Sequence, residues 1–222
     1  MSAREAILGR LRAAPRAQVQ PAEPAPREGV REGDRATLAR RFTEALSAAG
    51  GRVARVPDRA ALSRLLVREL DWTDQAIVLC SADPIVHKTV LPVRDILDRT
   101  TVLLWDPRDG DPDWLRTRAA GAAAGVTGAD ALLADTGTVV LAATVARPRV
   151  LSLLPRRHVV IATTDQLLPD LETWVERRAL VRSPDSCTAF VTGPSRTADI
   201  EKVLITGMHG PRELTVVLIG PD

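Results

Sequence analysis

Short apolar runs alternate along most of the chain with segments whose apolar residues recur every three or four positions. Runs of the first kind, bounded by Gly, Pro or acidic residues, are typical of buried strands, and segments of the second kind are typical of amphipathic helices. The pattern predicts strands at residues 52–56, 75–80, 101–105, 125–127, 138–143, 159–162, 189–192 and 214–219. It predicts helices at residues 34–49, 58–70, 112–120 and 165–178, with short helical pieces after SADP (81–84) and at 129–134.

This alternation predicts an α/β fold with a largely parallel sheet flanked by helices. One place departs from it. The strands on either side of residues 130–138 are separated by too few residues for a parallel crossover, so we expect an antiparallel or irregular insertion there.

Two parts are expected in the chain: an N-terminal helix with a Pro-rich linker (1–32) and a single α/β domain (33–222). Residues 2–13 place Ile7, Leu8 and Leu11 on one helical face, and residues 15–27 are rich in Pro and Ala. A short helix on such a tether must bury its apolar stripe. It can do so on its own domain or on a second protomer, which would make a homodimer, and the sequence leaves both open.

Composition narrows the setting of the protein. The 222 residues are 45% hydrophobic and 26% charged, with a net charge of +2, as in soluble globular proteins. Arginines are interspersed with acids, so we expect no nucleic-acid partner. No apolar run approaches the roughly 18 residues that a spanning helix needs, and the N-terminus lacks a signal-like apolar stretch. We therefore expect no membrane insertion and a cytoplasmic location.

The sequence contains no recognisable motif for binding a metal or a cofactor. The two cysteines, Cys80 and Cys187, are far apart and are expected to be buried reduced thiols, and without a CxxC pair the sequence offers no iron–sulfur ligands. His87, His158 and His209 lie at no ligand spacing, so no metal site is expected. No Walker A, GxGxxG or GxSxG motif occurs, so the cofactor is unknown.

Residues 189–219 carry the strongest candidate for a ligand site. A strand leads into the turn Gly193-Pro194-Ser195, and we expect a helix from Thr197, its N-cap, to Gly207. A Gly/Ser/Thr turn before a helix N-terminus offers N–H and hydroxyl donors to an anion. The sequence therefore predicts an anion-binding loop here.

Two other loops, GVTGAD (125–130) and ADTGT (134–138), are expected to lie beside it at the carboxyl ends of the strands. The candidate anion-binding residues are Thr136, Gly137, Thr138, Gly193, Pro194, Ser195, Arg196 and Thr197. The candidate acids or bases are Asp135, Asp199, Glu201 and His209. Asp199 and Glu201 can also be dipole partners in a first helical turn, and His209 a loop histidine bound to the backbone.

Five motifs in fixed order carry a resemblance to a known family: GVTGAD (125–130), LADTGTVVL (133–141), SLLPRRHVVI (152–161), TGPSRTADIE (192–201) and GMHGPRELTVVLI (207–219). Together they resemble the lactate-utilisation protein C family, the LUD-domain group. The resemblance implies a fold akin to the sugar-phosphate isomerase and coenzyme A transferase superfamily. It also implies that the chain, as the subunit without clusters, works with two iron–sulfur partner subunits in oxidising L-lactate to pyruvate. Asp135 stands where the family commonly has Glu, and Met208 where it often has Val.

Two functions of different classes follow. In the first, the chain is a subunit of a lactate-oxidising complex and its loops bind a carboxylate substrate or an anionic cofactor. In the second, it is a stand-alone enzyme or sensor for a phosphorylated or CoA-linked small molecule. A purely structural subunit with a relic pocket is a third reading.

Overall fold

The computed structural model describes residues 4–5, 10, 34–70, 76–95, 97, 100–108, 111–179, 186–198, 204–206 and 210–220. Most of the expected N-terminal helix and the whole Pro-rich linker therefore lie outside the described residues, and the division at residue 32 stays a prediction. Within the described ranges, no helix has both the length and the apolar character that a membrane crossing requires.

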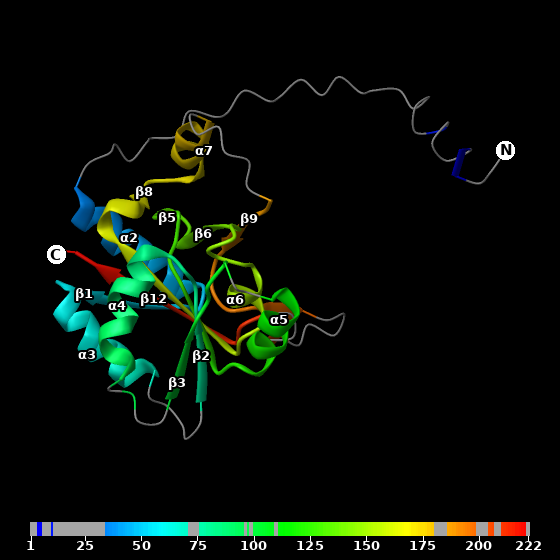
Figure 1. The fold of residues 1–222 in the computed structure, drawn as a ribbon. Helices are drawn as coiled ribbons and strands as arrows, with labels where there is room; N and C mark the ends of the chain where they lie inside the picture. The colour runs from blue at the N-terminus through cyan, green and yellow to red at the C-terminus, as the bar shows by residue number, and fades with distance from the viewer. Residues whose placement is uncertain are drawn as a thin grey trace.

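Six strands form one parallel sheet in the spatial order β1-β12-β7-β4-β2-β3 (Figure 1). They are β1 (Arg52–Val56), β2 (Ala76–Cys80), β3 (Thr100–Leu104), β4 (Ala124–Thr127), β7 (Arg157–Thr163) and β12 (Glu213–Ile219). Every pairing between them is parallel. Both the α/β class and the largely parallel sheet predicted from the sequence are confirmed.

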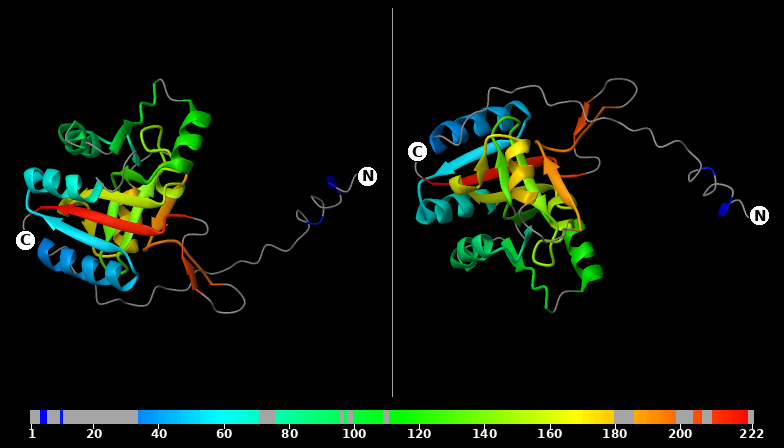
Figure 2. Two further views of the ribbon diagram at one scale, coloured as in Figure 1. Left: turned by 90° about the horizontal axis from the view of Figure 1, so that it is seen from below. Right: turned by 90° about the horizontal axis from the view of Figure 1, so that it is seen from above.

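Helices cover both faces of this sheet. On one face, α3 (Arg59–Leu70) and α4 (Pro84–Arg94) enclose a core that includes Val159 of β7. On the other face, α2 (Arg35–Ala48) packs over Val160, the next residue along the same strand. Helices α5 (Pro112–Gly121) and α6 (Val150–Leu153) lie on the same face of the sheet as α2. Figure 2 shows β12 running between β1 and the rest of the sheet. The alternation of side chains along each strand thus divides the core into two layers.

A second, four-stranded sheet lies on the α2 side, in the order β8-β5-β6-β9. Its strands are β5 (Ala131–Leu133), β6 (Thr138–Ala142), β8 (Leu167–Leu168) and β9 (Thr188–Val191), and α7 (Leu171–Ala179) covers its outer face. Strands β5 and β6 form an antiparallel hairpin, which confirms the predicted insertion. The predicted helical turn at 129–134 is wrong, because this apolar run is a strand paired with β6 on one side and β8 on the other.

The helix predicted at residues 165–178 is shorter than expected. A capping box between Thr163 and Gln166 closes a single 3-10 turn, η1 (Thr164–Gln166), which leads directly into β8. Helix α7 begins only after Pro169, where the Asp170 carboxylate accepts hydrogen bonds of 2.8 Å from the N–H and the hydroxyl of Thr173. Local capping therefore divides one amphipathic segment into three short elements.

The helix predicted from Thr197 to Gly207 is also wrong. Strand β10 (Arg196–Ala198) pairs in antiparallel fashion with β11 (Leu204–Thr206), so Thr197 lies in a strand and is not an N-cap. Leu204-Ile205-Thr206 is rich in β-branched residues, which favour such pairing over a short helix. Asp199, Glu201 and His209 lie outside the described residues.

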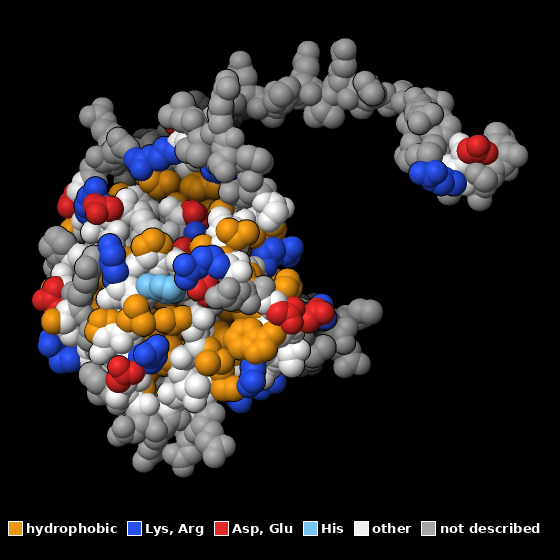
Figure 3. All heavy atoms as spheres, viewed as in Figure 1, with side chains coloured by type: hydrophobic (Ala, Val, Ile, Leu, Met, Phe, Trp, Pro, Cys, Tyr) orange, Lys and Arg blue, Asp and Glu red, His pale blue; other side chains and the backbone are white. Residues whose placement is uncertain are grey.

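Charged side chains of both signs are interspersed on the face shown in Figure 3. Among the described side chains of that face, basic and acidic groups alternate with apolar ones, and they form no continuous basic patch. This distribution agrees with the small net charge of the whole sequence.

Candidate functional site

The two predicted turns ADTGT and TGPS lie next to each other in space. The hydroxyl oxygens of Thr138 and Thr192 are 2.6 Å apart, and those of Thr136 and Thr138 are 2.8 Å apart. Thr136 also donates to the Asp135 carboxylate at 3.1 Å, and both of these side chains are exposed. A chain of hydroxyls thus joins the turn before β6 to the residue that follows β9.

These turns do not lie at the carboxyl edge of the parallel sheet, as the sequence led us to expect. Strand β9 belongs to the second sheet, and the turn after it faces the amino-terminal ends of β7 and β12. Residues 125–127 of the GVTGAD motif end β4, and residues 128–130 lie at the carboxyl edge. The Thr127 hydroxyl contacts His158, but the three predicted loops do not form one site. The loops are separated because β9 joins the second sheet, and the apolar pattern of the sequence does not show which sheet a strand joins.

The TGPS turn lines a cavity of about 280 Å³. Gly193, Pro194 and Ser195 form part of its wall, together with Thr192. Other elements contribute Ser152 of α6, His158 of β7, Leu214 of β12, and the Gly210-Pro211 turn. Among the described residues that line it, none has a carboxylate, ammonium or guanidinium group. The cavity therefore offers hydroxyls, one imidazole and apolar side chains to a ligand.

Glycines are needed in both turns because the chain approaches the end of α2 closely. Gly137 has a φ of +65°, and a Cβ there would overlap the backbone of Leu46, with only 2.6 Å to its Cα. Gly193 has a φ of +89°, and a Cβ there would lie 2.5 Å from the carbonyl oxygen of Ala49. The TGT and TGP turns therefore both dock on the C-terminus of α2, and of these two only TGP lines the cavity.

Arg196 is also directed toward α2. Its Nη2 donates to the carbonyl oxygen of Ala49, beyond the last turn of the helix. A guanidinium at a helix C-terminus satisfies an otherwise unpaired carbonyl and interacts favourably with the helix dipole. A ligand-binding role for Arg196, and for Thr197 beside it, stays a prediction.

His158 is the most deeply buried polar group of the cavity wall, with 1% of its surface exposed. Its Nε2 lies 2.9 Å from the Thr127 hydroxyl, and its Nδ1 has no hydrogen-bond partner among the described residues. Burial, and secondarily the charge of Arg147, lower the pKa of His158 to about 3. The ring is therefore neutral at any physiological pH.

This burial predicts a pH-dependent stability. The unfolded chain binds a proton at His158 near pH 6.5, whereas the folded protein does not until about pH 3, so stability is lost as the pH falls below about 6.5. We expect the free energy of unfolding to be about 1 kcal/mol lower at pH 5.5 than at pH 7 on account of this residue. Urea unfolding of wild type and His158→Gln at both pH values measures it. An equal change in the two proteins would contradict the assignment.

From the sequence, His158 is expected only to lack ligand spacing to the other histidines. The available signal was its position inside the apolar run of SLLPRRHVVI, where a histidine must be buried with the strand. A buried neutral imidazole beside a cavity is a typical feature of binding and catalytic sites.

A second polar cluster lies at the carboxyl edge of the parallel sheet. The chain runs from β2 to β3 on one side and returns to β4 on the other, so β2 and β4 flank the switch point where α/β sheets commonly bind ligands. Arg147 occupies this position: its Nη1 and Nη2 donate to the Asp130 carboxylate at 2.6 and 3.1 Å. Its Nε lies 3.3 Å from Asp83, an ion pair at that distance without good hydrogen-bond geometry.

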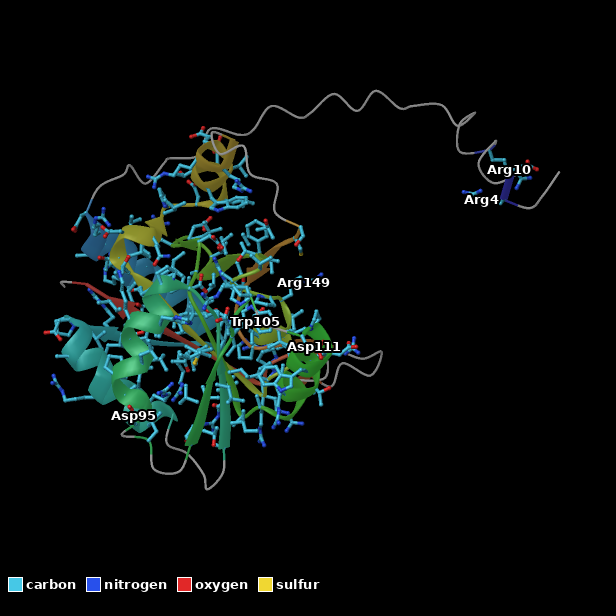
Figure 4. All side chains as sticks on the ribbon, in the orientation of Figure 1. Arg4, Arg10, Asp95, Trp105, Asp111 and Arg149 are labelled. Atoms are coloured by element: carbon cyan, nitrogen blue, oxygen red, sulfur yellow. The ribbon has the colours of Figure 1, made fainter. Side chains whose placement is uncertain are left out.

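The Asp83 carboxylate also accepts hydrogen bonds from the Ser81 hydroxyl at 2.6 Å and the Gly128 N–H at 3.0 Å. Asp83 stands at the N-cap position of α4, but its side chain makes no cap hydrogen bond. Trp105, labelled in Figure 4 just beyond β3, donates from Nε1 to the carbonyl oxygen of Val145 at 2.7 Å and so fixes the loop that carries Arg147. The chain's own ion pairs therefore fill the switch point.

A larger cavity, of about 370 Å³, lies between Asp130 and α7, and none of the predicted anion-binding residues lines it. The cysteines bring no chemistry to either cavity. Cys80 is buried as expected, and burial raises the pKa of its thiol, whereas Cys187 is only half-buried. In the part of the chain that the structure describes, no three His, Cys, Asp or Glu side chains are grouped as metal ligands would be.

Comparison with known proteins identifies the family. The model of the LUD domain matches residues 39–219 of this chain. The lactate utilization protein C of Exiguobacterium sp. is 37% identical over 120 residues, which cover 52% of this chain and 51% of that protein. The protein of the same name from Halalkalibacterium halodurans is 36% identical over 128 residues, covering 55% and 54%. The matches thus span about half the length of these relatives.

A solved structure supports the fold. The crystal structure of a DUF162 family protein from Deinococcus radiodurans superposes with a TM-score of 0.61 over 85% of this chain and 99% of that one, at 23% sequence identity. At that identity the likeness concerns the fold alone. Because the family model covers most of the described α/β core, including both polar clusters, the chain belongs to the LUD-domain family.

Proposed function

We propose that this protein takes part in lactate utilisation as the component without clusters, and that it binds a small carboxylate in the 280 Å³ cavity while iron–sulfur partner proteins carry the electrons. The LUD-domain match and the relatives named lactate utilization protein C support the pathway. The two cysteines of the sequence are too few to supply the four thiolates of a cluster, which supports the assignment of electron transfer to partner proteins.

The cavity itself is the observation that supports a small carboxylate as the ligand. It brings the TGPS turn together with the Gly210-Pro211 turn and His158, three segments far apart in the sequence. Its volume lies just below the range of about 300–1,000 Å³ that is usual for drug-sized ligands, so a short acid suits it. A CoA-linked ligand would exceed that volume, and a phosphate group, with a charge of about −2, would need more charge compensation than a carboxylate, which the uncharged described lining does not supply.

The experiment is reconstitution. We expect lactate-dependent reduction of an artificial electron acceptor when the chain is combined with iron–sulfur proteins of a lactate utilisation system, and at least a tenfold loss when the chain is omitted. Equal rates with and without the chain would contradict the proposal. Selective activity or binding with phosphosugars or CoA esters would instead favour the stand-alone enzyme or sensor. A cytoplasmic location and a homodimer formed through the N-terminal arm also remain proposals.

A further inference from the structure

The larger cavity, of about 370 Å³, has an indole and two guanidiniums in its wall. Arg177 and Arg178 lie three and four residues after Trp174 in α7, so the three side chains share one face of that helix. Trp174 also packs on β5 and β8 (Figure 1), and its ring meets Phe190 edge to face, with 5.2 Å between the ring centroids. These contacts hold the half-buried indole in place at the cavity wall.

This cavity lies at the carboxyl ends of two neighbouring strands of the parallel sheet. Among its lining residues, Asp130 follows β4, and Asp165 and Gln166 follow β7, which pairs with β4. In open α/β sheets, ligands commonly bind outside the carboxyl ends of the strands. The volume of the cavity falls within the range of about 300–1,000 Å³ that is usual for small-molecule sites. Both its position and its size therefore favour a ligand site.

The charges around the cavity favour an anion. Its two lining carboxylates are already paired with arginines that lie outside the lining: Asp130 accepts hydrogen bonds from Arg147, and Asp165 forms an ion pair with Arg35. The two guanidiniums of α7 add positive charge beside these pairs. Each guanidinium has five N–H donors, so it can bind an anion while it keeps another partner.

We propose that the 370 Å³ cavity binds a mononucleotide, whose aromatic base lies against Trp174 and whose phosphate is bound by Arg177 and Arg178. A phosphate monoester carries a charge of about −2 at neutral pH, which two guanidiniums match, and arginine binds phosphate through paired N–H donors. Tryptophan rings provide a surface on which aromatic bases stack. This site is separate from the cavity of the TGPS turn, because the two have no described lining residue in common.

Titration calorimetry of the full chain with AMP and FMN, two mononucleotides with different rings, tests the ligand class. We expect at least one of them to bind with a Kd below about 1 mM. The same compound without its phosphate, adenosine or riboflavin, and ribose 5-phosphate, which has no aromatic ring, should each bind at least tenfold more weakly. If neither mononucleotide binds, or if ribose 5-phosphate binds equally well, the inference is overturned.

Variants of the α7 face test the assigned residues. The double variant Arg177→Gln/Arg178→Gln should bind the mononucleotide at least tenfold more weakly, whereas Arg149→Gln, which removes an exposed arginine that does not line the cavity, should bind as wild type does. Trp174→Phe keeps an aromatic ring and should retain the affinity within a few-fold, and Trp174→Leu should lose at least tenfold. Circular dichroism checks that each variant folds. Wild-type affinity in the double arginine variant overturns the inference, whether or not Trp174→Leu folds.

A substitution in the smaller cavity distinguishes the two sites. Ser152 lines the 280 Å³ cavity and is absent from the wall of the larger one, so Ser152→Phe should leave the affinity for the mononucleotide unchanged. A tenfold loss in this variant would place the nucleotide in the smaller cavity and overturn the inference. Mononucleotide binding without lactate-dependent activity in the reconstituted system supports the second site and overturns the proposed function, and the reverse result does the opposite.

Discussion

Replacing Arg147 with Met is expected to lower the free energy of unfolding by about 3–5 kcal/mol. The Arg147 side chain is 9% exposed and pairs with Asp83, which is 14% exposed, and with Asp130. Removing the guanidinium leaves the largely buried Asp83 carboxylate without its cation, whereas the Asp130 side chain, 34% exposed, stays partly solvated. The loop between β6 and α6 also loses its anchor. Denaturant unfolding at pH 7 measures the change.

Arg149 provides the matched control. It lies two residues along the same loop, and its side chain is exposed (Figure 4). Arg149→Met removes the same charge from the same segment but should alter stability by no more than about 0.5 kcal/mol. Similar losses for the two variants would show that the pairs at the switch point contribute little.

Gly137→Ala is expected to destabilise the protein by about 2–4 kcal/mol. The residue has a φ of +65°, which an L side chain tolerates poorly, and its Cβ would displace the backbone of α2 at Leu46. Because the ADTGT turn is also joined to Thr192 through Thr138, we expect the cavity wall to shift with it. Thermal unfolding, with amide exchange of the 192–195 turn, tests both effects.

Gly121→Ala is the control for backbone entropy. Gly121 ends α5, and an added Cβ there would meet nothing within 4 Å. The same substitution should therefore be neutral or stabilise the protein by up to about 1 kcal/mol, by restricting the unfolded chain. A Gly137→Ala protein as stable as Gly121→Ala would contradict the close docking of the turn on α2.

The periodic elements could be predicted from the sequence because burial imposes their pattern. Strand β1 and helix α2 begin and end within a residue of the expected positions, since Asp34 caps the helix and Gly50, with a φ of +85°, ends it. The insertion around β5 and β6 was also predicted, because chain length alone forbids a crossover there.

Strands of three residues, such as β5, β10 and β11, could not be predicted in the same way. The segment from Thr197 has acids and a threonine where a helix start would place them, yet it pairs as β10 with β11. In such short segments, local preferences are weak and the pairing partner decides. The apolar run of β9 was recognised as a strand, but its place in the second sheet, and hence the position of the TGPS turn, depends on tertiary pairing.

The candidate site, like the fold, could be predicted only in part from the sequence. The two turns can be predicted from their Gly, Ser and Thr residues, and the glycine of each turn does adopt a positive φ. Arg147 was missed because one buried arginine in a loop rich in arginines has no sequence signature. His158 was seen only as an isolated histidine, because its significance depends on Thr127 and on a cavity that three distant segments form.

Titration calorimetry with pyruvate tests most directly whether the cavity beside the TGPS turn is a working site. Ser152 lines this cavity, so Ser152→Phe should fill it, whereas Ser47→Phe places the same ring on an exposed position of α2. We expect pyruvate to bind wild type and Ser47→Phe with a Kd in the millimolar range or tighter, and to bind Ser152→Phe at least tenfold more weakly. The absence of pyruvate binding to the wild type, or equal affinity in all three proteins, would contradict it.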